Sequence, residues 1–298
     1  MPYTVRSPYS DAAPVEINEG EFVALRATMK CLRLYLGIEE NFEAIVQMYI
    51  ELQTMLASET IAAALRDSDW NDFADVRLRI NISLAKFLSL ARQYLDHTSA
   101  AIYRIRRITK CDGGGDFAKA TNAQYDKSLG YRVMEALRNC TQHSMAATQS
   151  VRFRGQRVDD GNGAARREHM MEPRWVLGEL RENKKFKSKV LKEIEDLEAK
   201  GESPSVMRLL KEYCNGFAEL HLDLRTDLQN SYSAWRKKVD DLLARCREGF
   251  GDHSAVYISD EGRGLTEVVM RELHERIEHL RGRNAVRQFM FDFHIKTE

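Results

Sequence analysis

The sequence has few prolines, few cysteines and no long apolar run. Only five of the 298 residues are proline, so helices can continue over long stretches. The five cysteines lie far apart and no Cys-x-x-Cys pair occurs, so neither a disulfide framework nor a cysteine zinc site is expected. No window approaches the roughly 20 apolar residues that cross a bilayer, and residues 1–18 do not resemble a signal peptide. We therefore expect a soluble, cytoplasmic protein without a membrane segment.

The composition predicts a mostly α-helical protein. Lys and Arg number 45 and are balanced by 45 Asp and Glu, while 43% of the residues are apolar. That apolar share is enough for one large or two modest cores, so a disordered chain is not expected. Leu, Ala, Glu, Arg and Lys are abundant, and all of them favour helices.

Residues 20–150 are predicted to form an antiparallel bundle of about four helices. Apolar side chains recur every three or four positions over residues 38–65, which is one face of an amphipathic helix. A shorter helical element is expected over residues 23–36. Helices joined in this way by short connections pack as a bundle.

Two further helices complete the predicted bundle. The longer one would begin after a cap at Asp69 or Asn71 and end in a basic cluster that suits the helix dipole. That cluster consists of Arg104, Arg106, Arg107 and Lys110. The other helix would carry Tyr131 inward and end near His143.

Residues 151–298 are predicted to be mostly helical with short strands. Residues 150–155 alternate like a strand, and a boundary or exposed loop is expected near 155–170. After a solvated charged segment, a helix capped by Ser203, with Pro204 in its first turn, would carry the longest apolar stripe, from Val206 to Cys246. Such a helix would be roughly 60 Å long, so it would pair with another long helix or bend, at Gly216 for example. Two strands, over residues 255–259 and 289–295, are predicted to flank a helix over residues 265–280.

The sequence lacks the motifs of several common enzyme and binding sites. No nucleotide-binding P-loop, no His-Glu-x-x-His and no Gly-x-Ser-x-Gly occurs. His274 and His279 are five positions apart, about 140° around a helix, so they do not share a face as zinc ligands would. We interpret them as two exposed histidines on a charged helix, and no metal or other cofactor is predicted.

One segment stands apart, Leu137-Arg138-Asn139-Cys140-Thr141-Gln142-His143, preceded by Asp126 and Tyr131. It resembles the Arg-Asn-x-x-x-His signature of HEPN domains and, with its flanking residues, a phrase in uncharacterised bacterial HEPN-like proteins. The resemblance covers about residues 20–150. It implies a helical bundle with the activity of a metal-independent endoribonuclease. It also implies that the protein is a toxin or defends against phage, and that two copies form a homodimer through the bundle with facing motifs.

The residue types of this segment suit RNA cleavage. The 2′-hydroxyl of RNA can attack the neighbouring phosphate if one group moves a proton and a cation holds the growing charge. His143 is suited to the first role and Arg138 to the second, while Asn139 would orient the imidazole or the phosphate. The products would carry 2′,3′-cyclic phosphate ends. Asp126, Tyr131 and Gln142 are predicted to support this site.

Local charge favours an RNA partner. Residues 101–157 contain eleven Lys or Arg and four acidic residues, and a basic face attracts a phosphate backbone. Phe153 lies between two arginines, as aromatic residues do in single-strand binders. The RNA-binding candidates are Arg104, Arg107, Arg132, Arg152 and Arg154. The alternative is that these charges form an ordinary solvated surface.

The same residues also have structural interpretations. Arg138 would pair with Glu135 or Asp126, Asn139 would cap a turn, His143 would be a helix-end cation, and Tyr131 would be a core aromatic. The protein would then be a non-catalytic assembly protein that binds a protein partner through its C-terminal region and the helix over 206–246. A nucleotide-binding HEPN module is a third alternative. The role of residues 151–298, whether sensing a trigger, restraining the nuclease or building the dimer, stays open.

Overall fold

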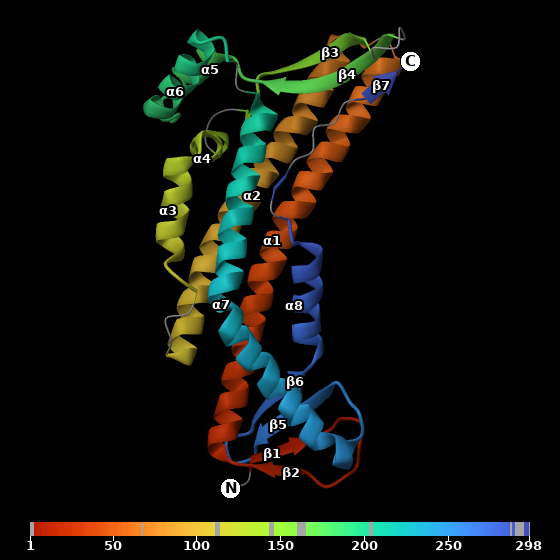
Figure 1. Ribbon diagram of the computed structural model, residues 1–298, viewed down its shortest axis with the longest axis vertical. Helices are drawn as coiled ribbons and strands as arrows, with labels where there is room; N and C mark the ends of the chain where they lie inside the picture. Colours follow the sequence, from red (N-terminus) through yellow and green to blue (C-terminus); the bar gives the residue numbers. More distant parts are fainter. Residues whose placement is uncertain are drawn as a thin grey trace. The chain divides into compact units, whose positions relative to one another are not determined.

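A computed structural model describes residues 3–66, 68–110, 114–142, 146–159, 165–202, 205–286, 288–289 and 295–297 (Figure 1). The described chain is mostly helical and has two small antiparallel sheets, which confirms the predicted fold class. Its helices are α1 (Glu19–Leu65), α2 (Trp70–Thr109), α3 (Phe117–Lys127), α4 (Leu129–Thr141), α5 (Leu177–Glu182), α6 (Ser188–Ala199), α7 (Val206–Phe250) and α8 (Glu272–Arg283). Its strands are β1 (Tyr3–Arg6), β2 (Val15–Ile17), β3 (Ser150–Asp159), β4 (Ala165–Arg174), β5 (Ala255–Asp260), β6 (Leu265–Met270) and β7 (Ile295–Thr297).

The chain divides into two compact units. The first unit contains residues 1–43, 94–117 and 221–285, and the second contains residues 44–93, 118–220 and 286–298. Helices α1, α2 and α7 contribute residues to both units. Each unit therefore draws on both sides of residue 150, where the sequence alone suggested a division.

Helix α1 is longer than predicted, because the elements expected over 23–36 and 38–65 are one helix. Gly37, which separates them in the sequence, lies inside the helix, where an added Cβ would meet nothing within 4 Å. Asn18 caps the beginning of α1, since its Oδ1 accepts a hydrogen bond from the backbone N–H of Glu21 at 2.8 Å.

Helix α2 begins at the predicted cap, and the structure selects Asp69 over Asn71. The Asp69 Oδ1 accepts hydrogen bonds from the backbone N–H groups of Asn71 at 2.7 Å and Asp72 at 3.0 Å. The Asp72 carboxylate in return accepts from the Asp69 N–H at 2.9 Å, so the cap is reciprocal. These backbone donors lower the pKa of Asp69.

The helix predicted to end near His143 is preceded by a separate short helix, α3. Ser128 divides the two, because its side chain accepts from the Tyr131 N–H and caps α4. Gly130, in the first turn of α4, lies against α7: a Cβ at this position would come within 2.4 Å of the Leu209 carbonyl oxygen. The packing of α4 on α7 therefore requires glycine here.

The first unit contains a four-stranded antiparallel sheet with the order β2-β1-β5-β6. Thr4 in β1 is opposite Ser259 in β5, and Val5 is opposite Ile258. Strand β5 covers the strand predicted over 255–259. The predicted helix over 265–280 is corrected: residues 265–270 form β6, and α8 begins at Glu272. The β-branched residues of β6 and Gly264, which takes the positive φ of the connecting turn, explain the hairpin.

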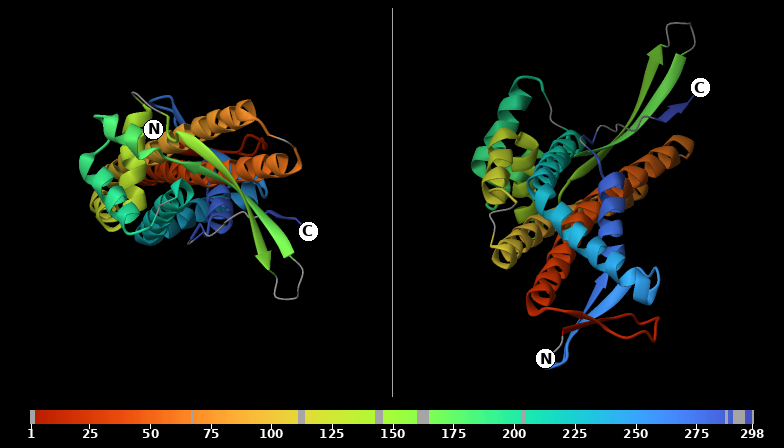
Figure 2. Two further views of the ribbon diagram at one scale, coloured as in Figure 1. Left: turned by 90° about the horizontal axis from the view of Figure 1, so that it is seen from above. Right: turned by 60° about the horizontal axis from the view of Figure 1, so that its bottom comes forward.

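The second unit contains a three-stranded sheet with the order β3-β4-β7, in which β3 and β4 form an antiparallel hairpin (Figure 2). The strand predicted at 150–155 is confirmed, but it continues to Asp159 and is paired with β4 over 165–174. The exposed loop expected near 155–170 is therefore wrong for these paired residues. Of the strand predicted over 289–295, residues 290–294 lie outside the described residues, and β7 covers 295–297.

The longest apolar stripe is confirmed as the single helix α7. Ser203 and Pro204 lie outside the described residues, and the side chain of Ser205 accepts from the Arg208 N–H at 3.0 Å. Gly216 lies within α7, and Tyr131 packs against it. An added Cβ would meet the Tyr131 ring at 3.1 Å, so the close contact suits a glycine. The charged segment before α7 contains helix α6, which buries Val190 and Ile194.

Candidate functional site

The residues proposed from the sequence as a catalytic group begin at the end of α4, a helix that is mostly buried. Its buried residues are Gly130, Tyr131, Val133, Met134, Ala136, Leu137 and Cys140. Arg138 and Asn139 lie on the half-buried flank of this helix, and Gln142 follows it as an exposed C-cap residue. His143 lies outside the described residues.

The guanidinium of Arg138 is held between two neighbours on its own helix. Its Nη2 donates to the Gln142 Oε1 at 3.3 Å, and its Nη1 lies 3.8 Å from the Glu135 carboxylate. The arginine side chain is 19% exposed. Its Nε is buried and has no hydrogen-bond partner in the described chain. The guanidinium thus retains donor capacity that its present partners do not use.

Glu135 is itself anchored in the second unit. The Tyr213 hydroxyl donates a hydrogen bond of 2.6 Å to the Glu135 carboxylate. Burial, together with the negative charge of Glu135, raises the pKa of Tyr213 well above its ordinary value, so this hydroxyl stays protonated as the donor. Of the two predicted structural partners of Arg138, the structure shows Glu135.

Asp126 and Tyr131 do not join Arg138. Tyr131 is fully buried, with its ring edge-on to Tyr213 at 4.9 Å and stacked with Phe217 at 5.8 Å. It is therefore the core aromatic of the structural interpretation. Asp126 is exposed in the last turn of α3, where its backbone carbonyl accepts from Arg132 at 2.8 Å.

Asn139 does not cap a turn within the described chain: Gln142 occupies the C-cap of α4, and its N–H donates to the Arg138 carbonyl at 3.2 Å. The Asn139 amide, half-buried beside Arg138, makes no hydrogen bond to any described residue.

The segment that follows residues 143–145 is anchored by α2. The Asn81 side chain accepts from the Thr148 N–H at 2.7 Å and donates to the Thr148 carbonyl at 2.9 Å. Arg77 donates to the Gln149 carbonyl at 3.0 Å, and the Trp175 indole donates to the Ala147 carbonyl at 2.9 Å. Sequence patterns did not point to these residues, because each recognises a backbone group far away in the chain.

The RNA-binding candidates have different surroundings. Arg132 is committed to the fold, since it donates to Glu193 at 2.6 and 3.1 Å and to two backbone carbonyls. Arg152 and Arg154 are exposed at alternate positions of β3, on either side of Phe153, whose ring stacks on His169. Arg104 and Arg107 belong to the first unit, where they line a hollow of about 340 Å³ together with Lys30.

The apolar stripe of α7 is used within the chain. Tyr213, Phe217, Leu224, Leu228 and Trp235 are all buried. The stripe that suggested a partner-binding helix therefore forms part of the protein's own core, and it is not available as a docking surface.

The two histidines of α8 differ from the prediction of two exposed side chains. His279 is exposed, but His274 is only 3% exposed, because it faces α7. Its Nε2 lies 3.5 Å from the Asp240 carboxylate. Burial lowers the pKa of His274.

An ionic network inside the first unit was not predicted. Glu39 and His221 are completely buried, and Arg225 nearly so. His221 and Arg225 interrupt the apolar stripe of α7 four positions apart, which was the available signal. The network is closed to solvent, so we assign it to the core and not to a site.

No family model, curated protein or solved structure matches the chain. No helix among the described residues combines the length and apolar character needed to cross a membrane. Within the described ranges, no three His, Cys, Asp or Glu side chains gather as metal ligands would.

Proposed function

We propose that the protein is a metal-independent endoribonuclease of the HEPN type, in which Arg138, Asn139 and His143 form the catalytic group. The observation that carries the proposal is the position of the Arg138 guanidinium, which Gln142 and Glu135 hold at the end of α4. Helix α4 ends at Thr141, two residues before His143 in the sequence.

The chemistry divides between these side chains. Arg138 binds the non-bridging oxygens of the scissile phosphate with the donors that Glu135 and Gln142 leave unused. His143 takes the proton of the 2′-hydroxyl, whose oxygen then attacks phosphorus. The bond from phosphorus to the 5′-oxygen breaks, and this oxygen takes a proton from water. Asn139 donates an amide hydrogen to the phosphate or orients the imidazole. The products are a 2′,3′-cyclic phosphate and a 5′-hydroxyl.

The RNA partner would contact the exposed arginines of β3, Arg152 and Arg154, whose side chains are available in the second unit. Arg132 is a weak candidate for this role, because its donors are already occupied. A homodimer that brings two copies of α4 together, and a setting in a toxin or in defence against phage, rest on the resemblance alone.

Cleavage of total RNA in EDTA tests the proposal. Wild-type protein should produce 2′,3′-cyclic phosphate ends, whereas Arg138→Ala and His143→Ala should lose at least about a hundredfold in rate. Arg181→Ala is the matched control, since it removes an exposed ion pair with Glu195 on α5 and α6 and should leave the rate unchanged. Circular dichroism establishes that each variant is folded.

The second candidate is a non-catalytic assembly protein, and the Tyr213–Glu135–Arg138 chain of contacts favours it. In that case Arg138 stabilises α4 and binds no phosphate. RNA that stays intact with the folded wild-type protein and with both variants alike would support this candidate and overturn the nuclease proposal.

A further inference from the structure

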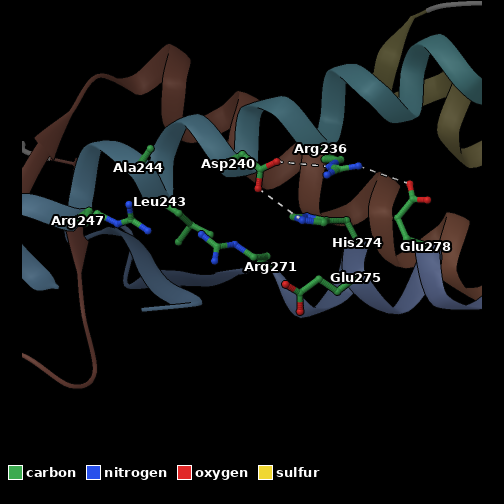
Figure 3. A pocket seen from close by; sticks show the side chains of 9 residues that line it. All are labelled: Arg236, Asp240, Leu243, Ala244, Arg247, Arg271, His274, Glu275 and Glu278. Atoms are coloured by element: carbon green, nitrogen blue, oxygen red, sulfur yellow. Dashed lines mark ion pairs between the residues drawn. The ribbon is translucent and has the colours of Figure 1, made fainter. Parts of the chain in front are cut away.

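A hollow of about 530 Å³ lies between α7 and α8, entirely within the first unit (Figure 3). This volume falls in the range of small-ligand sites, roughly 300 to 1,000 Å³. Its charged walls carry three arginines and three carboxylates, with His274 between them. The hollow is separate from α4 in the sequence and plays no part in the function proposed above.

One end of the hollow is basic. Figure 3 shows the side chains of Arg247, on α7, and Arg271, which immediately precedes α8, both extending toward the space beside Leu243. The Arg271 guanidinium makes no hydrogen bond or ion pair with any described residue, and no side chain caps the beginning of α8 there. The anion now nearest to the two cations is Asp252: the hydrogen bond from Arg247, together with the charges of Arg247 and Arg271, lowers the pKa of this carboxyl. An anionic ligand would take its place between the two guanidinium groups.

The partner of Arg247 is easily exchanged. Arg247 pairs with Asp252 at 2.8 Å, but the two side chains are 61% and 60% exposed. Exposed ion pairs contribute little to stability. A phosphate that binds Arg247 and Arg271 together therefore competes with a weak interaction.

The other end of the hollow is acidic. Asp240 is held by Arg236 at 3.5 Å and by the His274 Nε2 at 3.5 Å, while Arg236 also reaches Glu278 at 3.8 Å. Glu275, exposed on α8, accepts no hydrogen bond from the described chain. This end therefore offers carboxylate acceptors to the amino or hydroxyl groups of a ligand.

His274 supplies a second indication of a ligand. It is 3% exposed, and its Nδ1 is buried without a hydrogen-bond partner in the described residues. The Nε2 of this ring lies 3.5 Å from the Asp240 carboxylate, and the residue lines the hollow, so the unpaired Nδ1 adds an unused polar atom beside it. Unpaired buried polar atoms are uncommon in folded proteins and call for an explanation.

We propose that this hollow binds a small phosphomonoester that carries hydrogen-bond donors at its other end, the chemistry of a nucleoside monophosphate. The phosphate lies between Arg247 and Arg271, and the amino or hydroxyl groups face Asp240 and Glu275. The equal numbers of arginines and carboxylates disfavour a polyanion such as RNA, because three carboxylates would repel its neighbouring phosphates.

Titration of the full chain with three probes tests this site. Adenosine monophosphate should bind and raise the melting temperature more than inorganic phosphate or adenosine at the same concentration. Arg271→Ala should weaken adenosine monophosphate about tenfold, the usual effect of losing one charge-assisted contact. Glu275→Gln should weaken adenosine monophosphate but leave inorganic phosphate unchanged.

Arg276→Ala is the control, since Arg276 is exposed on the same helix but does not line the hollow. Arg276→Ala should bind adenosine monophosphate as tightly as the wild type does. The proposal is overturned if no probe binds, if Arg271→Ala binds as tightly as the wild type, or if Arg276→Ala loses as much as Arg271→Ala, which would indicate unspecific charge attraction. Arg271→Lys, which keeps the charge, replaces the alanine variant if the latter does not fold.

Discussion

Arg225 donates hydrogen bonds to both carboxylate oxygens of Glu39, from Nε to Oε1 at 3.0 Å and from Nη2 to Oε2 at 2.6 Å. The pair lies inside the first unit, where His221 joins it through Nε2, 3.2 Å from the same carboxylate. Nδ1 of His221 accepts from the Tyr94 hydroxyl at 3.0 Å. Arg225 also donates to the Asn284 carbonyl at 3.0 Å, so the buried charges are well supplied with partners.

Glu39→Gln should destabilise the protein by about 3–5 kcal/mol, because Arg225 would keep its buried charge without a countercharge. The measurement is the free energy of unfolding in urea. Glu40→Gln serves as the control, since Glu40 is exposed on the same helix and should change stability by less than about 0.5 kcal/mol. An equal effect of the two substitutions would show that the pair contributes no more than a surface charge.

Stability should fall as the solution is acidified, in two stages. Burial lowers the pKa of His221, so below its ordinary value of about 6.5 the unfolded chain takes up a proton that the folded chain resists. Burial alone would raise the pKa of Glu39, but hydrogen bonds from His221 and Arg225 outweigh it and lower the pKa to about 2. The stability that Glu39 contributes is therefore complete above about 4.5 and is lost as the pH falls toward 2.

The measurement of this pH dependence is the unfolding free energy between pH 8 and pH 3. His221→Gln should flatten the first stage and leave the second, while His274, whose pKa is also lowered, keeps part of the slope near pH 6. A wild-type profile that is flat from pH 8 to pH 5 would contradict the assignment of a buried neutral imidazole.

Gly130→Ala should cost about 1–3 kcal/mol, because the new methyl group would overlap the Leu209 carbonyl and the Glu212 Cβ, 2.4 and 2.5 Å away. Gly249→Ala is the matched control within α7: nothing lies within 4 Å of its added Cβ, and alanine should stabilise the helix by up to about 1 kcal/mol. Thermal unfolding measures both. If α4 also carries the nuclease residues, only Gly130→Ala should reduce RNA cleavage.

The helices were predictable where one face is apolar over many turns. The stripe from Val206 to Cys246 predicted α7, and the cap predicted at Asp69 or Asn71 located the beginning of α2. The join of the first two predicted elements into α1 was missed, because Gly37 suggests a break but costs a helix interior only about 1 kcal/mol.

Features that depend on contacts between distant segments were not predictable. Periodicity places His221, Arg225 and His274 near buried faces but does not reveal the carboxylates they meet. The β3–β4 hairpin was also missed, because charged residues in its strands resemble a solvated loop until their pairing is known. At the candidate site, sequence order gave Arg138 two possible partners, and only packing selected Glu135.

The salt bridge between α1 and α7 fixes their alignment along the helix axes. An aliphatic seam would tolerate sliding by one turn, about 5.4 Å, with little change in the area it buries. The same slip would break the two hydrogen bonds between Arg225 and Glu39 and the contact of His221 with this carboxylate. The buried pair of Glu39 and Arg225 thus favours the alignment in which the two helices are found.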